Sequence, residues 1–138
     1  MEKSVPRQIK PTETEKVTIN LGYVDLGRID LLVEEGFYTS RTDFIRAAIR
    51  AQLGAQAAEV GRLIERRTLD MGLRDVSRAD LEAAREAGEL LHLRVVGLIR
   101  LAPDIPPDLA LATIGSINVL GALQAPPDLR AALAHRIT

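Results

Sequence analysis

Cysteine is absent from the chain, which excludes a disulfide framework, a thiolate zinc site and a cysteine nucleophile. Aromatic residues make up only 3% of the 138 residues, so any core has to be built from Leu, Ile, Val and Ala. The formal net charge of -1 argues against a protein that coats nucleic acid non-specifically, although it is compatible with a local basic face.

No apolar run approaches the roughly 18 residues that a membrane-spanning helix needs, and the polar residues 1–16 contain no signal-peptide core. We therefore expect a cytoplasmic protein without membrane contact. The chain is 46% hydrophobic and 27% charged, which is typical of one ordinary globular domain or two small ones. Residues 1–14 contain two prolines and mixed charge, and we expect them to form a flexible arm.

Residues 16–21 alternate between polar and apolar side chains, which predicts a short strand with one buried face. Gly22 ends this strand. The apolar residues that follow have helical spacing instead, at Leu26, Ile29, Leu32 and Val33. Gly36 stands where a helix C-terminus favours a left-handed residue, so we expect the first helix to end there.

A second helix is expected directly after this break. Ser40 and Asp43 have the spacing of a capping box, with Asp in place of the usual Glu. The residues behind them form one apolar stripe: Phe44, Ile45, Ala48, Ile49 and Leu53. One strand and two helices of this length cannot bury a core alone, so we expect a second copy of the chain to complete it.

This stretch, residues 15–53, resembles the ribbon-helix-helix family of DNA-binding proteins, the class of MetJ and Arc. The match is carried by KVTINL as the ribbon, GYVDLGRIDLLVEEGFY as the first helix and TSRTDFIRAAIRAQL as the second helix. The segment SRTDFIRAAIR is the most specific part. The resemblance implies an intertwined homodimer, in which each chain supplies one strand of a ribbon that enters the major groove of double-stranded DNA.

The resemblance also implies roles for single residues. The outward side chains of the ribbon are expected to read base edges: Lys16, Thr18 and Asn20. The start of the second helix is expected to hold a DNA phosphate, through Thr39, Ser40, Arg41 and Thr42. The shared dimer core is expected to contain Val17, Ile19, Leu21, Ile29, Phe44, Ile45 and Ile49.

One position departs from the family pattern. Many relatives carry a long basic residue where this chain has Asn20, so Lys16 is the one cation on the ribbon. We therefore expect a modest attraction to phosphate. Binding would then need several dimers side by side, or help from the arm residues Lys3, Arg7 and Lys10.

The middle of the chain is expected to be mostly helical. Residues 69–76 are expected to form a linker or turn, and Ser77 with Asp80 predicts a capped helix after it. Residues 54–90 are therefore expected to form a helical connector.

Two aliphatic runs follow, residues 91–101 and 114–123, and both predict strands. They belong to an internal repeat, because VVGLIRLAPDIPPDLALA resembles NVLGALQAPPDLRAALA. Pro107 and Pro127 suit the first turn of a short helix in each copy. We therefore expect residues 91–138 to form a C-terminal domain of two strand–turn–helix repeats, which serves oligomerisation or effector binding.

As a whole, the sequence predicts an α+β protein that contains the ribbon-helix-helix dimer, the helical connector and the C-terminal repeat domain. Its expected function is sequence-specific binding of double-stranded DNA, as a transcriptional repressor whose dimers assemble cooperatively. Three alternatives stay open: a plasmid-partition centromere-binding protein, an antitoxin, and a self-assembling structural protein anchored to DNA.

Other kinds of chemistry are not expected. The two histidines, His92 and His135, are far apart in the sequence, whereas a sensor site for a transition metal usually gathers several His and a Cys. No catalytic Ser/His/Asp spacing, phosphate loop or nucleotide fingerprint is present. The sequence therefore predicts a protein that is not an enzyme and that uses no cofactor and no metal.

Overall fold

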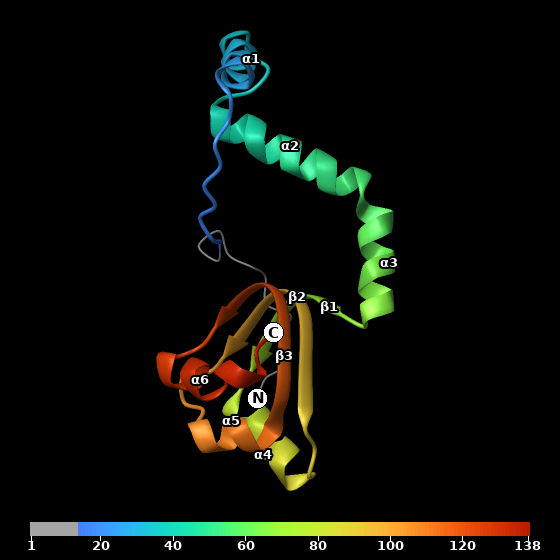
Figure 1. Ribbon diagram of the computed structural model, residues 1–138, viewed down its shortest axis with the longest axis vertical. Helices are drawn as coiled ribbons and strands as arrows, with labels where there is room; N and C mark the ends of the chain where they lie inside the picture. Colours follow the sequence, from blue (N-terminus) through green and yellow to red (C-terminus); the bar gives the residue numbers. More distant parts are fainter. Residues whose placement is uncertain (1–13) are drawn as a thin grey trace. The chain divides into compact units, whose positions relative to one another are not determined.

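The computed structural model describes residues 14–138, which divide into two compact units (Figure 1). The N-terminal unit extends to Leu63 and the C-terminal unit begins at Ile64. Helices and strands are both present, which is consistent with the expected α+β class. Apart from Thr14, the arm predicted over residues 1–14 lies outside the described residues. No helix within the described range is long and apolar enough to span a membrane.

Helices make up most of the N-terminal unit. α1 (Tyr23–Glu34) and α2 (Arg41–Ala55) are separated by a tight turn at Gly36, whose φ of 87° favours glycine. α3 (Ala57–Arg67) follows α2 almost without a break and crosses the boundary between the two units. The two helices predicted from apolar spacing, α1 and α2, are therefore confirmed.

The predicted strand over residues 16–21 belongs to neither a helix nor a strand in this single chain. A strand is recognised by its pairing, and the expected ribbon pairs two copies of the same segment. The side chains of residues 16–20 are exposed, and Leu21 is half-buried. The ribbon therefore stays a prediction, because one chain cannot form it.

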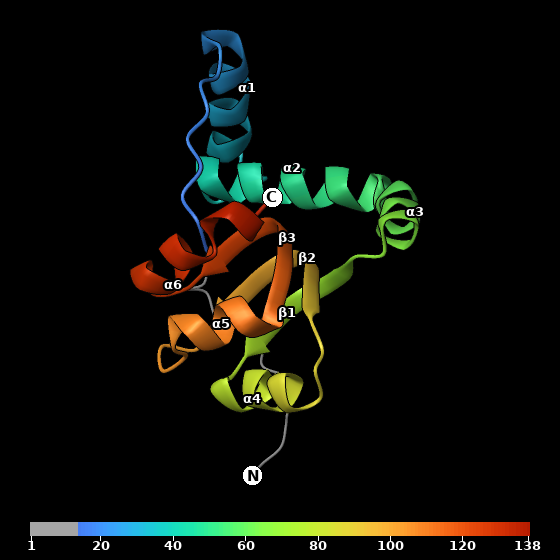
Figure 2. The same cartoon turned by 60° about the horizontal axis from the view of Figure 1, so that its bottom comes forward.

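Strands and helices alternate in the C-terminal unit. Its sheet contains three parallel strands in the order β1-β2-β3, namely β1 (Asp70–Val76), β2 (Leu91–Leu101) and β3 (Ile114–Gln124). One helix follows each strand, namely α4 (Arg78–Glu86), α5 (Pro107–Thr113) and α6 (Pro127–Ala132), and the 3-10 helix η1 (Ala134–Arg136) comes last. α4 contacts α5 and α5 contacts α6, so the helices lie side by side on one face of the sheet (Figure 2). Within residues 70–138, no helix covers the other face.

The three strand–helix units of this sheet share one structure. Gly72, Gly97 and Gly121 are paired in register across the sheet, with φ values of 124°, 138° and 127°. A side chain at Gly97 or Gly121 would collide with the carbonyl of the glycine on the preceding strand. Each unit also buries one leucine of its helix: Leu81, Leu109 and Leu129. The two repeats predicted over residues 91–138 are therefore present as β2 with α5 and β3 with α6, and β1 with α4 forms a third unit that was not predicted.

The unit formed by β1 and α4 was not predicted, because β1 has few of the residues that are typical of a strand. The sequence predicted a linker or turn over residues 69–76, whereas that segment pairs with β2. Its composition is typical of a turn, because it contains Gly72 and the charged residues Asp70, Arg74 and Asp75. β1 is a strand because it pairs with β2, which lies beyond α4 in the sequence. The residues of β1 themselves therefore give little sign of a strand.

The other local predictions in this half are confirmed. β2 and β3 are the two aliphatic runs, and α5 and α6 begin at Pro107 and Pro127. Ser77 caps α4, because its Oγ accepts a hydrogen bond from the Asp80 N–H and the Asp80 carboxylate accepts one from the Ser77 N–H. The segment predicted as a helical connector thus contains α3 and α4 with β1 between them.

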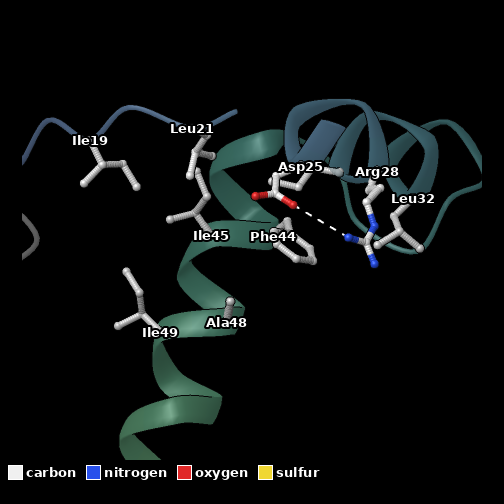
Figure 3. A pocket seen from close by; sticks show the side chains of 10 residues that line it. Ile19, Leu21, Asp25, Arg28, Leu32, Phe44, Ile45, Ala48 and Ile49 are labelled. Atoms are coloured by element: carbon white, nitrogen blue, oxygen red, sulfur yellow. Dashed lines mark ion pairs between the residues drawn. The ribbon is translucent and has the colours of Figure 1, made fainter. Parts of the chain in front are cut away.

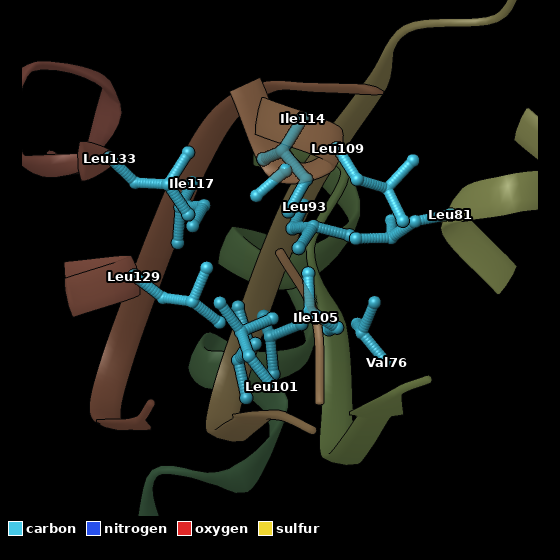
Figure 4. Packing of buried hydrophobic residues seen from close by; sticks show 13 residues of the cluster. Val76, Leu81, Leu93, Leu101, Ile105, Leu109, Ile114, Ile117, Leu129 and Leu133 are labelled. Atoms are coloured by element: carbon cyan, nitrogen blue, oxygen red, sulfur yellow. The ribbon is translucent and has the colours of Figure 1, made fainter. Parts of the chain in front are cut away.

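The core of the C-terminal unit lies between the sheet and its helices (Figure 4). Leu93, Ile99 and Ile117 are fully buried from the strand side and meet the buried leucines of the helices. Thr113 is the one buried polar side chain among the described residues, and its Oγ1 donates a hydrogen bond to the Leu109 carbonyl at 2.7 Å. The C-terminal unit therefore completes its core within one chain.

Candidate functional site

The segment before α1 presents two kinds of side chain in alternation. Lys16, Thr18 and Asn20 are exposed, and so are Val17 (78%) and Ile19 (58%) between them. Apolar surface left in water forgoes roughly 25 cal/mol per Å² of stabilisation. The segment therefore combines polar groups that can form new hydrogen bonds with apolar groups that favour burial.

An open apolar hollow of about 510 Å³ lies beside this segment (Figure 3). Asp25 and Arg28 of α1 form an ion pair of 3.7 Å at its wall. The apolar side chains of the lining come from the segment, from α1 and from α2: Ile19, Leu21, Ile29, Leu32, Phe44, Ile45, Ala48 and Ile49. Three elements of the N-terminal unit thus direct apolar groups at one open space.

The N-terminal unit has almost no core of its own. Ile29 is its one buried apolar side chain among residues 14–63, whereas Ile49 at the wall of the hollow is 53% exposed. Full burial of one such side chain contributes only about 1.5–3 kcal/mol, while ordering the backbone costs about 1–2 kcal/mol per residue. Full burial of apolar side chains within one chain therefore contributes little to the stability of this unit.

The start of α2 leaves backbone donors available. Ser40 is the N-cap, and its Oγ accepts a hydrogen bond from the Asp43 N–H at 3.0 Å. The Asp43 carboxylate accepts from the Thr39 N–H at 3.0 Å, so this box closes one residue before the predicted position. The N–H groups of Arg41 and Thr42 lie in the first turn, where a helix supplies no acceptor. Together with the helix dipole, they favour an anion at this point.

The sequence model of the ribbon-helix-helix transcriptional regulator family matches residues 12–130. The chain belongs to this family. The match reaches far beyond residues 15–53, from which the family was predicted, and extends into α6 of the C-terminal unit. No curated protein and no solved structure matches the chain. The family is one of DNA-binding transcriptional regulators, which typically bind as dimers and are typically not enzymes.

In this ribbon-helix-helix regulator, the residues predicted for the dimer core gather at the hollow. All of them line it except Val17, which is exposed elsewhere on the segment. Leu32 and Ala48 line it as well; the sequence placed them in the apolar stripes but not in the dimer core. The sequence did not reveal Asp25 and Arg28, although their spacing of three positions on a helix is typical of an ion pair.

The side chain of Arg41 is already engaged in this regulator. Its Nε and Nη2 donate to the two carboxylate oxygens of Asp30 at 2.8 and 2.9 Å, which joins α2 to α1. The hydrogen bond from Arg41, followed by its charge, lowers the pKa of Asp30, and the same bond raises the pKa of Arg41. Because both groups are exposed, the pair adds little stability. The two bonds to Asp30 use two of the five N–H donors of the guanidinium, so its remaining donors can contact a phosphate alongside the backbone N–H groups.

The two histidines of this regulator have separate partners. His92 Nδ1 is hydrogen-bonded to Ser116 Oγ at 2.8 Å, and His135 Nε2 accepts from Arg136 Nε at 3.1 Å. In the part of the chain that the structure describes, no group of three or more His, Asp or Glu residues is placed to hold a metal ion.

Proposed function

We propose that this regulator binds double-stranded DNA in a sequence-specific manner, as a homodimer, and acts as a cytoplasmic transcriptional repressor. The observation that carries the proposal is the open apolar hollow beside an alternating segment, in a unit with one buried apolar side chain. A second copy that pairs segment with segment brings its apolar side chains to the hollow. The same pairing leaves the polar side chains of both copies on the outer face of a two-stranded ribbon, which fits the major groove.

The polar residues of the ribbon differ in what they recognise. Lys16 donates to the O6 and N7 atoms of guanine, and Asn20 bonds adenine with both ends of its amide. Thr18 forms hydrogen bonds or contacts the methyl group of thymine. Because two chains contribute the same residues, the recognised DNA has two-fold symmetry.

In this proposal the start of α2 holds one DNA phosphate per chain. The N–H groups of Arg41 and Thr42 donate to the phosphate, and Thr39 and Ser40 position that turn. A contact of this kind fixes the position of the protein on the duplex and carries no sequence information.

We expect Ser40→Ala to destabilise the N-terminal unit by about 0.5–2 kcal/mol, the usual cost of losing an N-cap, and to weaken DNA binding as well. Ser77→Ala is the matched control, because Ser77 caps α4 with the same hydrogen bond. It should cost similar stability in the C-terminal unit and leave DNA affinity unchanged. Thermal unfolding and fluorescence-anisotropy titration measure the two effects. Equal DNA affinity of both variants would take the phosphate role away from the start of α2.

Repression follows from occupancy of the DNA. We propose that dimers line up on tandem sites and block the polymerase, with residues 91–138 joining neighbouring dimers. A dimer joined to a bound neighbour then meets its DNA site at a high effective concentration, which exceeds the concentration of free dimer. This linkage compensates for a ribbon on which Lys16 is the one cation.

Footprinting of the full-length protein on the DNA upstream of its own gene, across a salt series, tests the proposal. We expect phased protection that survives competitor DNA and weakens as salt rises, because phosphate contacts release counterions. The spacing of the protected half-sites gives the arrangement of dimers. Absence of protection at low salt would refute sequence-specific binding at this site.

A further inference from the structure

The two edges of the C-terminal sheet differ in charge. β1 carries Asp70, Arg74 and Asp75 among its seven residues, whereas β3 contains no charged residue. Charged side chains on an edge strand oppose pairing with another chain, and an uncharged edge of this length invites it. The β1 edge is therefore protected against a partner strand and the β3 edge is not.

Both ends of the β3 edge are occupied within the chain. At one end Ile137 forms a parallel bridge with Ile117, and the Thr138 N–H donates to the Ile117 carbonyl at 2.8 Å. Towards the other end the Arg130 guanidinium of α6 donates to the Leu123 carbonyl. The stretch between these contacts, residues 119–122, has no further strand beside it among the described residues.

The backbone of this open stretch faces outward at alternate residues. In a parallel sheet the N–H and C=O of one residue point to the same side, and the side alternates along the strand. The Ile117 carbonyl points away from β2, because it accepts from Thr138. Val119 and Gly121 therefore direct their backbone donors and acceptors away from the sheet, and Gly121 has no side chain to obstruct a neighbour.

We propose that β3 pairs in antiparallel fashion with β3 of a second copy of the chain, about a two-fold axis near Leu120, so that Val119 of each copy lies opposite Gly121 of the other. The two sheets then continue across the interface as one. On the face without helices, Leu120, which is 44% exposed, and the half-buried Ala122 meet the same residues of the other copy. No charged side chain of β3 has to be desolvated. A second copy is available because the family typically binds as dimers.

This pairing specifies how residues 91–138 would join two copies of the chain. It rests on that part of the proposed function. It is measured without DNA, so its failure leaves the ribbon-helix-helix proposal intact. It also adds an isologous contact, which closes on itself and so joins copies in pairs.

The absence of cysteine permits a clean cross-linking test with full-length single-cysteine variants and a short bismaleimide. Leu120→Cys should give a covalent dimer, because opposite or diagonal residues of paired strands lie within about 8 Å of each other. Met71→Cys is the matched control, since Met71 lies in the same row of the sheet on the other edge and is more exposed, at 74%. Val96→Cys, in the same row on the central strand, is the second control.

The inference is supported if Leu120→Cys gives a covalent dimer and the two control variants give none. The Leu120→Cys dimer should also persist when Ile49→Asp removes the N-terminal pairing. Cross-linking of Val96→Cys would place the open sheet faces against each other and would overturn it. Cross-linking that requires a mixture of Met71→Cys and Leu120→Cys proteins would show β3 paired with β1 and would also overturn it. So would equal yields from all three variants, or no product from Leu120→Cys.

Discussion

Ile49→Asp is expected to abolish specific DNA binding. Ile49 lies at the wall of the open hollow and is 53% exposed in one chain, so the proposed dimer has to bury it. An aspartate at this place would bring an unpaired carboxylate into an apolar interface, which costs several kcal/mol. Each 1.4 kcal/mol changes an equilibrium about tenfold, so we expect affinity for the operator to fall by more than about a hundredfold.

Ile49→Leu is the control for this variant, because it keeps the apolar character and the volume and should change binding little. Gel-shift titration measures the loss, and circular dichroism shows whether the C-terminal unit stays folded. That unit has its own core, so the strand signal of β1, β2 and β3 should persist in Ile49→Asp. Full DNA affinity in Ile49→Asp would contradict the shared core.

Asn20→Ala is expected to relax base preference at one position of each half-site. A bidentate contact to the correct base discriminates by about 1–3 kcal/mol, so preference for that base pair should fall by between about 5-fold and 150-fold. Asn20 is exposed and lies outside the helices, so the free energy of unfolding should change little.

Binding selection from a library of randomised half-sites measures this preference directly. Affinity for unrelated DNA is the internal control, because Asn20 carries no charge and phosphate attraction should stay the same. An unchanged preference would remove Asn20 from the recognition face and leave Lys16 and Thr18 as the candidates.

What could be predicted from the sequence was local chemistry. Ser77 with Asp80 marks the start of α4, and Pro107 and Pro127 mark the starts of α5 and α6, because capping and the fixed φ of proline act within a few residues. The family could be predicted as well, since the whole ribbon-helix-helix pattern lies in one short stretch of the chain.

What could not be predicted depends on distant partners. β1 is a strand because β2 pairs with it, and its charged residues hide this from the local pattern. The bond between Arg41 and Asp30 joins two helices, and nothing in the spacing of these residues reveals it. The roles of Lys16, Thr18 and Asn20 stay predictions, because they depend on a second chain and on DNA.

The contrast between the two units has a consequence for abundance. The C-terminal core is complete in one chain, so this unit can fold before it meets a second copy. The N-terminal unit has one buried apolar side chain, so in the proposed dimer its folding is coupled to association and follows mass action. At low abundance, the active form would increase with the square of total protein. Promoter occupancy would then respond to synthesis and dilution of the protein with a threshold rather than in proportion.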